Sequence, residues 1–354
     1  MNKAEPIAHS RPFLGKEEKE ACAKVIDRGY LAAGPENQAF AEELCERYSR
    51  KYALLTSSGA TALHLAILSL NPNSDTKAHI PSYVCSALLN AVNQSKAQAT
   101  IHDTPHKGFL LEPNLQKIAP KKGDIIIYPQ LLGCRQKIQS VEGTHLIEDC
   151  AMSLGKDSLQ QGELSIASFY ATKLMTTGQG GAILTDRQDL YETIRDMMAY
   201  DNQEHYRVRY NYDLPDVSAA IGRVQLKKLD EFESQRIESI SHYDELFSKK
   251  MPDLLAFKGG LVKAFPGQAL FRYWVNVANI EQCMEHCAGE KIEVKRPVYK
   301  PLHRYFESND ALYPFASEAH GRMLSLPLYP GLSKEQRERV ADAVCAMARA
   351  IAGH

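Results

Sequence analysis

The fold is decided by the stretch Ser165-Ile-Ala-Ser-Phe-Tyr-Ala-Thr-Lys173-Leu-Met-Thr-Thr-Gly-Gln-Gly-Gly-Ala-Ile-Leu-Thr185. It begins as an apolar strand over residues 166–170, reaches one lysine, Lys173, and passes through a glycine-rich loop into a second apolar run over 182–184. A lysine held between two strands is expected to lose part of its water, and this lowers the pKa of its amine. Because a neutral amine attacks carbonyl carbons, the pattern favours a Schiff-base lysine, with a solvated loop lysine as the alternative.

Two segments upstream of this stretch carry further candidate site residues. His145-Leu-Ile-Glu-Asp149 is an apolar strand that ends in a carboxylate. Thr56-Ser-Ser-Gly-Ala-Thr-Ala-Leu63 is a strand-to-helix turn, whose backbone N–H groups and hydroxyls suit an anion. Each segment taken alone is also compatible with a plain helix N-cap. A phosphate cup, a strand-end aspartate and a loop lysine, in that order, are the three anchors of a pyridoxal-phosphate (PLP) enzyme.

These segments resemble the DegT/StrS-type sugar aminotransferases, which are PLP enzymes with the aspartate aminotransferase fold (fold type I). The resemblance rests on residues 57–65, 147–151, 168–182, 211–212 and 219–226, and it extends from Arg11 to Leu328. It implies an α/β fold: a large domain with a mostly parallel seven-stranded sheet, and a smaller C-terminal α+β domain.

The apolar runs by themselves also indicate an α/β protein. Short strands are predicted at 52–55, 77–80, 97–101, 124–128, 144–147, 166–169 and 182–185, and helical stretches separate several of them. This alternation predicts a largely parallel sheet that is covered on both faces. A long helix is predicted from 217 to 240, and we expect the domains, 1–235 and 236–354, to divide within it. The second domain should hold a strand over 270–277 and a closing helix over 334–351.

The resemblance implies a role for each site residue. Lys173 would hold the cofactor and transfer protons, and Asp149 would pair with the pyridine nitrogen; Glu148, on the opposite face of the strand, would be structural. The remaining cofactor-binding candidates are Gly59, Ala60, Thr61, Tyr83, Ser168 and Asn211. Tyr83 is the candidate ring cover, because Cys85 occupies the usual aromatic position. Asn211 matches an asparagine that reaches the phosphate of the neighbouring subunit, which implies a homodimer with shared active sites.

The substrate is the part of the function that the sequence defines least. A basic, proline-stiffened loop supplies Lys295, Arg296 and His303 as candidate substrate contacts, with a solvated basic loop as the alternative. Three positions depart from the family pattern: Gln130, Met152 and Asp213 stand where histidine, glutamine and arginine are common. These departures leave the catalytic essentials in place, but they argue against copying a substrate from better-known relatives.

Composition excludes several classes of protein. The formal net charge is -1, so no global field attracts nucleic acid or an anionic membrane. The N-terminus lacks the apolar core of a signal peptide, and no run of apolar residues is long enough to span a bilayer. The eight cysteines form no Cys-x-x-Cys pair, and no metal site is expected. We therefore expect a cytoplasmic protein with reduced thiols.

The sequence thus predicts a PLP-dependent aminotransferase. The resemblance adds the substrates: an amino-acid donor, L-glutamate, and a keto-sugar acceptor, a nucleotide-linked keto-deoxy sugar. One alternative is a sugar dehydratase on the same fold, but those relatives replace the lysine with histidine. Another is a catalytically silent binding or regulatory protein, against which the joint presence of Lys173, Asp149 and the phosphate segment argues.

Overall fold

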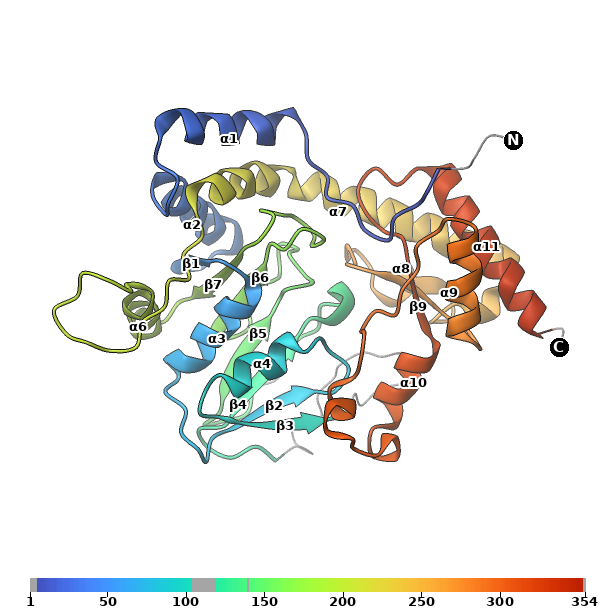
Figure 1. Ribbon diagram of the computed structural model, residues 1–354. Coiled ribbons are helices and arrows are strands. Elements are labelled where there is room, and N and C mark those ends of the chain that lie inside the picture. Colours follow the sequence, from blue (N-terminus) through green and yellow to red (C-terminus); the bar gives the residue numbers. More distant parts are fainter. Residues whose placement is uncertain (1–4, 104–118, 139, 353–354) are drawn as a thin grey trace.

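A seven-stranded sheet forms the centre of the computed structural model, which describes residues 5–103, 119–138 and 140–352 (Figure 1). Its strand order is β1-β7-β6-β5-β4-β2-β3, and β7 alone runs antiparallel to its neighbours. The strands are β1 (Tyr52–Thr56), β2 (Lys77–Pro81), β3 (Gln98–His102), β4 (Ile125–Pro129), β5 (His145–Asp149), β6 (Leu164–Ser168) and β7 (Gly181–Thr185). The predicted mostly parallel sheet is confirmed, and each strand lies within two residues of its expected bounds.

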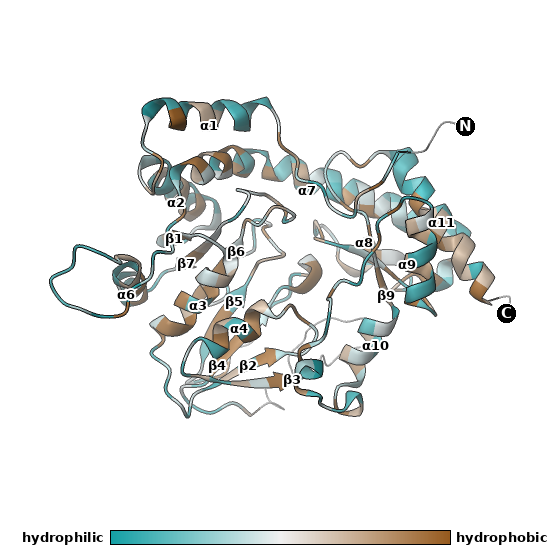
Figure 2. Cartoon of the chain, viewed as in Figure 1, coloured by the Kyte–Doolittle hydropathy of each residue, from teal (hydrophilic) through white to brown (hydrophobic). Residues whose placement is uncertain are grey.

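Helices cover both faces of this sheet, as the alternating apolar pattern predicted. On one face, α3 (Gly59–Ser69), α4 (Ala87–Asn93) and α6 (Gln188–Met198) pack against strand residues such as Ile147 and Ile183. On the other, α2 (Pro35–Tyr48) and the first half of α7 (Asp216–Lys250) pack against Ala167 and Leu184. Neighbouring residues of β7, Ile183 and Leu184, therefore belong to different cores, as a doubly covered strand requires. Figure 2 shows the matching apolar colouring of the strands and of α3.

A second, smaller sheet lies at the other end of α7. It pairs β8 (Tyr273–Asn276) with β9 (Met323–Leu326) in antiparallel fashion. The remaining elements are α1 (Lys16–Arg28), α8 (Gly260–Ala264), α9 (Ile280–Gly289), α10 (Pro314–Arg322), α11 (Lys334–Ala352), and the short 3-10 segments η1 (Leu131–Gly133), η2 (Pro252–Leu254), η3 (Leu302–Phe306) and η4 (Asp310–Leu312). In the described part of the chain, no helix combines the length and apolar character needed to cross a membrane.

Helix α7 joins the two sheets and runs ten residues past its predicted end at 240. The extension has a packing cause: Tyr243 stacks on Tyr273 of β8 with ring centroids 4.7 Å apart. A division between two domains within α7 remains our proposal. The N-terminal segment would then join the smaller unit, because Ile7 forms a parallel bridge with Ile292.

A histidine pair at the edge of the sheet generates a prediction about stability and pH. Nδ1 of His79 and Nε2 of His102 are 2.9 Å apart, and burial, followed by the charge of His79, lowers the pKa of His102 to about 4. The unfolded chain takes up a proton below its ordinary pKa of 6.5, whereas the folded chain does not until about pH 4. The contribution of His102 to the free energy of unfolding is therefore complete above pH 6.5. It is lost as the pH falls toward 4, by up to about 3 kcal/mol.

Urea unfolding of the wild type at pH 7 and pH 4.5 measures that loss. In His102→Gln the drop in free energy of unfolding should be smaller, by about 2 kcal/mol. His205→Gln, a change at a solvent-exposed histidine, should behave like the wild type. An equal drop in all three proteins would contradict the assignment.

The start of α3 and the start of β7 approach closely enough to require glycine, and this generates a second prediction. A Cβ on Gly181 would lie 2.6 Å from the backbone N of Gly59 and from the carbonyl carbon of Ser58. Because moving backbone atoms to relieve this clash costs energy, Gly181→Ala should lower the free energy of unfolding by about 1–3 kcal/mol. The control is Gly321→Ala in α10, where a Cβ meets open space and should cost nothing. Equal urea midpoints for the two variants would refute the constraint.

Candidate active site

Lys173 sits in a loop that folds back onto the end of the strand before it. The N–H of Thr177 donates to the carbonyl of Phe169 (3.0 Å), and the N–H of Phe169 donates to the carbonyl of Gly180 (2.8 Å). Within the loop, the N–H of Lys173 donates to the carbonyl of Tyr170 (2.9 Å). The lysine is therefore carried by a closed turn between β6 and β7, which limits where its side chain can reach.

The amine of Lys173 is poorly hydrated and lacks a counter-ion. The side chain is half-buried, and its Nζ lies 5.1 Å from the ring centroid of Phe271. Burial is the main cause that lowers the pKa of Lys173; the charge of Arg272 adds to it, and Cys85 and Asp149 oppose it. Among the residues that the structure describes, none forms an ion pair with this amine. The amine is thus shifted toward its neutral form, in the direction that the sequence predicted.

Asp149 ends β5, where its carboxylate is buried. Its Oδ1 accepts a hydrogen bond from the N–H of Ala151 at 2.9 Å. Burial raises the pKa of Asp149, and the nearby Glu148 raises it further, whereas Ala151 and Lys173 act in the opposite direction. Glu148 faces the other side of the strand and accepts from Oγ of Ser165 at 2.9 Å, in the structural role that the sequence predicted for it.

Lys173 and Asp149 line one small pocket. The other lining residues are Val84, Cys85, Leu88, Pro129, Gln130, Leu131, Ala151 and Met152. Tyr83, the candidate ring cover, is not among them: its side chain is fully buried in the core. The pocket therefore offers Cys85, Leu88 and Ala151 as cover for a flat ring, in place of the expected tyrosine.

The first turn of α3 forms a cup at the end of β6. Ser58 caps the helix by accepting from the N–H of Thr61 (3.1 Å), and the Thr61 hydroxyl donates to the carbonyl of Ser58 (2.8 Å). Gly59 and Ala60 follow the cap, and the first N–H groups of a helix have no acceptor within it. Ser168 packs directly against the cup, because a Cβ on Gly59 would lie 2.7 Å from the Cβ of Ser168. Backbone N–H groups and a serine hydroxyl thus converge where an anion would bind.

These features fit PLP. The cup at the start of α3 can hold a phosphate, and the amine of Lys173 can bind an aldehyde. The buried carboxylate of Asp149 can pair with a protonated ring nitrogen, because a cation beside it would favour its ionised form. Two of the departures from the family pattern, Gln130 and Met152, also line the pocket. Both are engaged within the protein: Nε2 of Gln130 donates to Glu148 (3.2 Å), and Sδ of Met152 accepts from the N–H of Leu132 (3.4 Å).

Asn211 is exposed, beside the cup of its own chain. Its neighbour Tyr212 accepts a hydrogen bond from the N–H of Ser57 at 2.7 Å, and Asp213 forms a bridge with Thr56. The preceding loop, between α6 and α7, extends away from the body of the molecule (Figure 1). It exposes three apolar side chains, those of Tyr200, Tyr206 and Val208.

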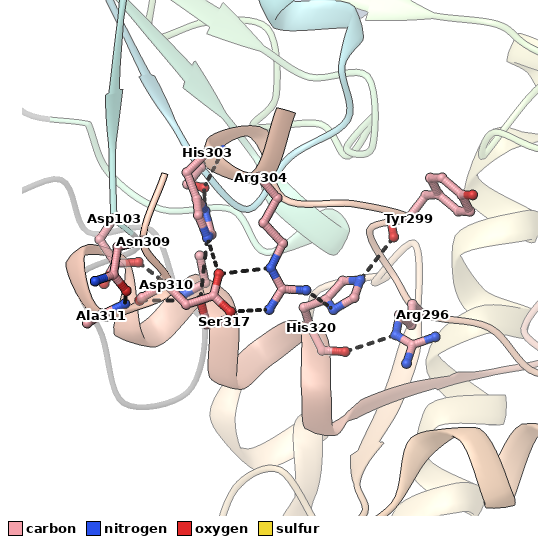
Figure 3. Close-up of polar contacts among 12 residues, drawn as sticks. Asp103, Arg296, Tyr299, His303, Arg304, Asn309, Asp310, Ala311, Ser317 and His320 are labelled. Atoms are coloured by element: carbon pink, nitrogen blue, oxygen red, sulfur yellow. Dashed lines mark hydrogen bonds and ion pairs between the residues drawn. The ribbon is translucent and has the colours of Figure 1, made fainter. Parts of the chain in front are cut away.

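His303 is fully buried and is not among the residues that line the pocket; Figure 3 shows its ring pointing toward Asp310. Its Nδ1 lies 2.6 Å from Oγ of Ser82 and its Nε2 lies 2.9 Å from Oδ1 of Asp310. Its ring is stacked on that of Tyr313 with centroids 4.3 Å apart. Both nitrogens are thus used within the protein, so the structure gives His303 an internal packing role in place of the predicted substrate contact.

The two basic candidates of the same loop are engaged with nearby groups. Nζ of Lys295 lies 2.7 Å from Oε1 of Glu293, and Arg296 pairs with Glu281 and donates from Nε to the carbonyl of His320 (3.0 Å; Figure 3). Lys295 is about half exposed, and Arg296 is half-buried. Substrate binding by either residue remains a prediction.

Phe271 and Arg272 lie near Lys173, but the sequence pattern predicted no role for them. The strand predicted over 270–277 was interpreted from its apolar residues alone, and it begins only at Tyr273. The available signal was Arg272 itself, a single charge within an otherwise apolar and aromatic run.

Comparison with known proteins agrees with this geometry. The model of the DegT/DnrJ/EryC1/StrS aminotransferase family matches residues 12–345. GDP-perosamine synthase of Escherichia coli O157:H7 is 26% identical in an alignment that covers 94% of this chain and 96% of that protein. Among solved structures, the Helicobacter pylori aminotransferase PseC, involved in pseudoaminic acid biosynthesis, superposes with a TM-score of 0.85 at 20% identity, over 98% of this chain and 100% of that one. The putative sugar aminotransferase Spr1654 of Streptococcus pneumoniae, in its PMP-form, superposes with a TM-score of 0.87 at 18% identity, over 99% of both chains. The chain belongs to the DegT/DnrJ/EryC1/StrS aminotransferase family.

Proposed function

We propose that this PLP-dependent aminotransferase moves an amino group from L-glutamate to a nucleotide-linked keto-deoxy sugar. The observation that carries the proposal is the shared pocket of Lys173 and Asp149. Family membership supports the reaction class. The sugar acceptor is supported by the relatives, one of which is named for a GDP-linked sugar.

The residues of the pocket divide the chemistry between them. When bound, PLP supplies an aldehyde that captures amino groups and a ring that withdraws electrons from the reacting carbon. The Nζ of Lys173 would hold the aldehyde carbon covalently. Once displaced by the donor amine, it would accept the proton from Cα of the donor and return it to the cofactor. Asp149 would keep a proton on the ring nitrogen, with an effect that is strengthened by its burial. Leu88 and Ala151, which line the pocket, would help to exclude water from the ring.

The site of action and the assembly are part of the same proposal. All eight cysteines are unpaired, which suits the reducing cytoplasm. We propose a homodimer in which the exposed loop before Asn211 reaches the partner and Asn211 contributes to the partner's phosphate site. The exposed Tyr206 and Val208 on this loop support an interface there, because exposed apolar side chains that cluster often mark contacts between chains.

The reaction is tested with purified protein, PLP and glutamate. Borohydride reduction should fix the cofactor mass to the peptide that contains Lys173, and glutamate should release 2-oxoglutarate. A panel of nucleotide keto-sugars, scored by product mass, then identifies the acceptor. Lys173→Ala should lower kcat by about 10²–10⁴-fold, because it removes the group that transfers the proton. The control is Lys156→Ala, at a lysine whose side chain is 71% exposed.

The outcomes separate the alternatives. A colour change on adding the sugar without release of the keto acid from glutamate would favour a dehydratase. Failure to take up the cofactor at all would favour a binding or regulatory protein.

The shared site is tested with mixed dimers of Lys173→Ala and Asn211→Ala. Each variant alone should be nearly inactive, since every site then lacks one of the two groups. In a mixed dimer one site regains both groups, so random mixing should restore about a quarter of the wild-type activity. Absence of recovery in dimers verified to be mixed would place Asn211 in the site of its own subunit.

A further inference from the structure

Two cationic groups face the same buried ring. Nζ of Lys173 lies 5.1 Å from the ring centroid of Phe271, and Cζ of Arg272 lies 3.9 Å from it. A third cation, Arg236, lies nearby: its Nη1 donates to the carbonyls of Phe271 and Leu328, each at 3.3 Å, and its buried Nε has no partner among the described residues. The side of the site next to the lysine is therefore strongly positive.

Arg272 has no counter-ion in the described part of the chain. Its hydrogen bond is from Nη1 to Oγ of Ser10, at 2.7 Å. Glu293 is the carboxylate whose charge acts on Arg272. It forms its contacts with other groups: it pairs with Lys295 (2.7 Å) and accepts a hydrogen bond from the N–H of His9 (2.9 Å). Burial lowers the pKa of Arg272 to about 9. A largely buried guanidinium without an anion is costly, and an incoming anion would remove that cost.

The orientation of Arg272 is set by the N-terminal segment. Ser10, which accepts its hydrogen bond, lies within 3.5 Å of Nδ1 of His9. The Nε2 of His9 lies 2.9 Å from Oγ of Ser325 in β9. Arg272 is thus held at one nitrogen by a chain of contacts that leads to the smaller sheet, and its remaining N–H groups are available to a ligand.

We propose that Arg272, oriented by Ser10, receives a carboxylate of the amino-acid donor. The inference rests on the proposed function and names the donor site within it. A guanidinium fork matches the two oxygens of a carboxylate. The position also fits a small donor, because Arg272 and the reacting amine lie against one ring. The diphosphate of a nucleotide sugar is a poorer match, since the sugar ring would separate it from the keto carbon, which must reach the cofactor beside Lys173.

The test is calorimetric titration with succinate, a dicarboxylate that cannot transfer an amino group, on protein with and without added PLP. Arg272→Gln should weaken succinate binding by roughly tenfold to a hundredfold, the effect of losing a charged hydrogen-bonding partner. Ser10→Ala should weaken it by a smaller factor, and Arg272→Lys should retain part of the affinity. The control is Arg187→Gln, at an exposed arginine that is already paired with Asp189 and lies outside the candidate site.

Every outcome of this titration bears on the proposal. The proposal would be overturned if the wild type showed no detectable succinate binding. It would also be overturned if Arg272→Lys and Ser10→Ala bound succinate as tightly as the wild type. Both results can be obtained even if Arg272→Gln fails to fold. A parallel titration with GDP should give the same affinity in all variants. Weakened GDP binding with unchanged succinate binding would assign Arg272 to a phosphate instead. Because succinate binding needs no turnover, loss of the proposed reaction would leave this result readable.

Discussion

The removal of water from the amine of Lys173 is the constraint on which the site depends. The loop that carries the lysine is closed on both sides by hydrogen bonds to Phe169, and the aromatic ring of Phe271 lies beside the amine. Burial makes the charged form of the amine unfavourable and, by the same physics, makes the charged form of Asp149 unfavourable. Both groups are thus set to interact with a ligand that brings complementary charge, which is the general condition for a preorganised site.

Those parts of the structure that follow from local sequence pattern could be predicted. Strands β6 and β7 are short apolar runs whose neighbouring residues serve two cores, and such runs can be recognised from the sequence pattern alone. Asp149 ends β5 and Lys173 follows β6, its parallel neighbour in the sheet, and residues at the carboxyl ends of parallel strands meet at one edge. The capping of α3 by Ser58 was equally visible, because that hydrogen bond joins residues three apart in the chain.

The parts that depend on distant segments could not be predicted. The sequence placed His303 in an exposed basic loop. In the structure it is buried, and its ring contacts Ser82, which is distant in the sequence. Tyr83 and Cys85 lie on one short segment, and only the packing of the whole domain decides that the thiol faces the pocket and the ring does not. Helix α7 runs past its predicted end because Tyr243 meets the smaller sheet, which the helix period cannot reveal.

Under the proposed division of the chain, the charged groups near Lys173 come from both units. The large sheet supplies the carboxylate of Asp149 and the amine of Lys173, whereas Arg272 is held by Ser10 and precedes β8 of the smaller sheet. A ligand that bridges Lys173 and Arg272 would therefore tie the two units together through the ring of Phe271. Because binding energy shared between two units favours the arrangement in which both contacts are made, the donor itself would stabilise the arrangement in which it contacts Lys173 and Arg272 together.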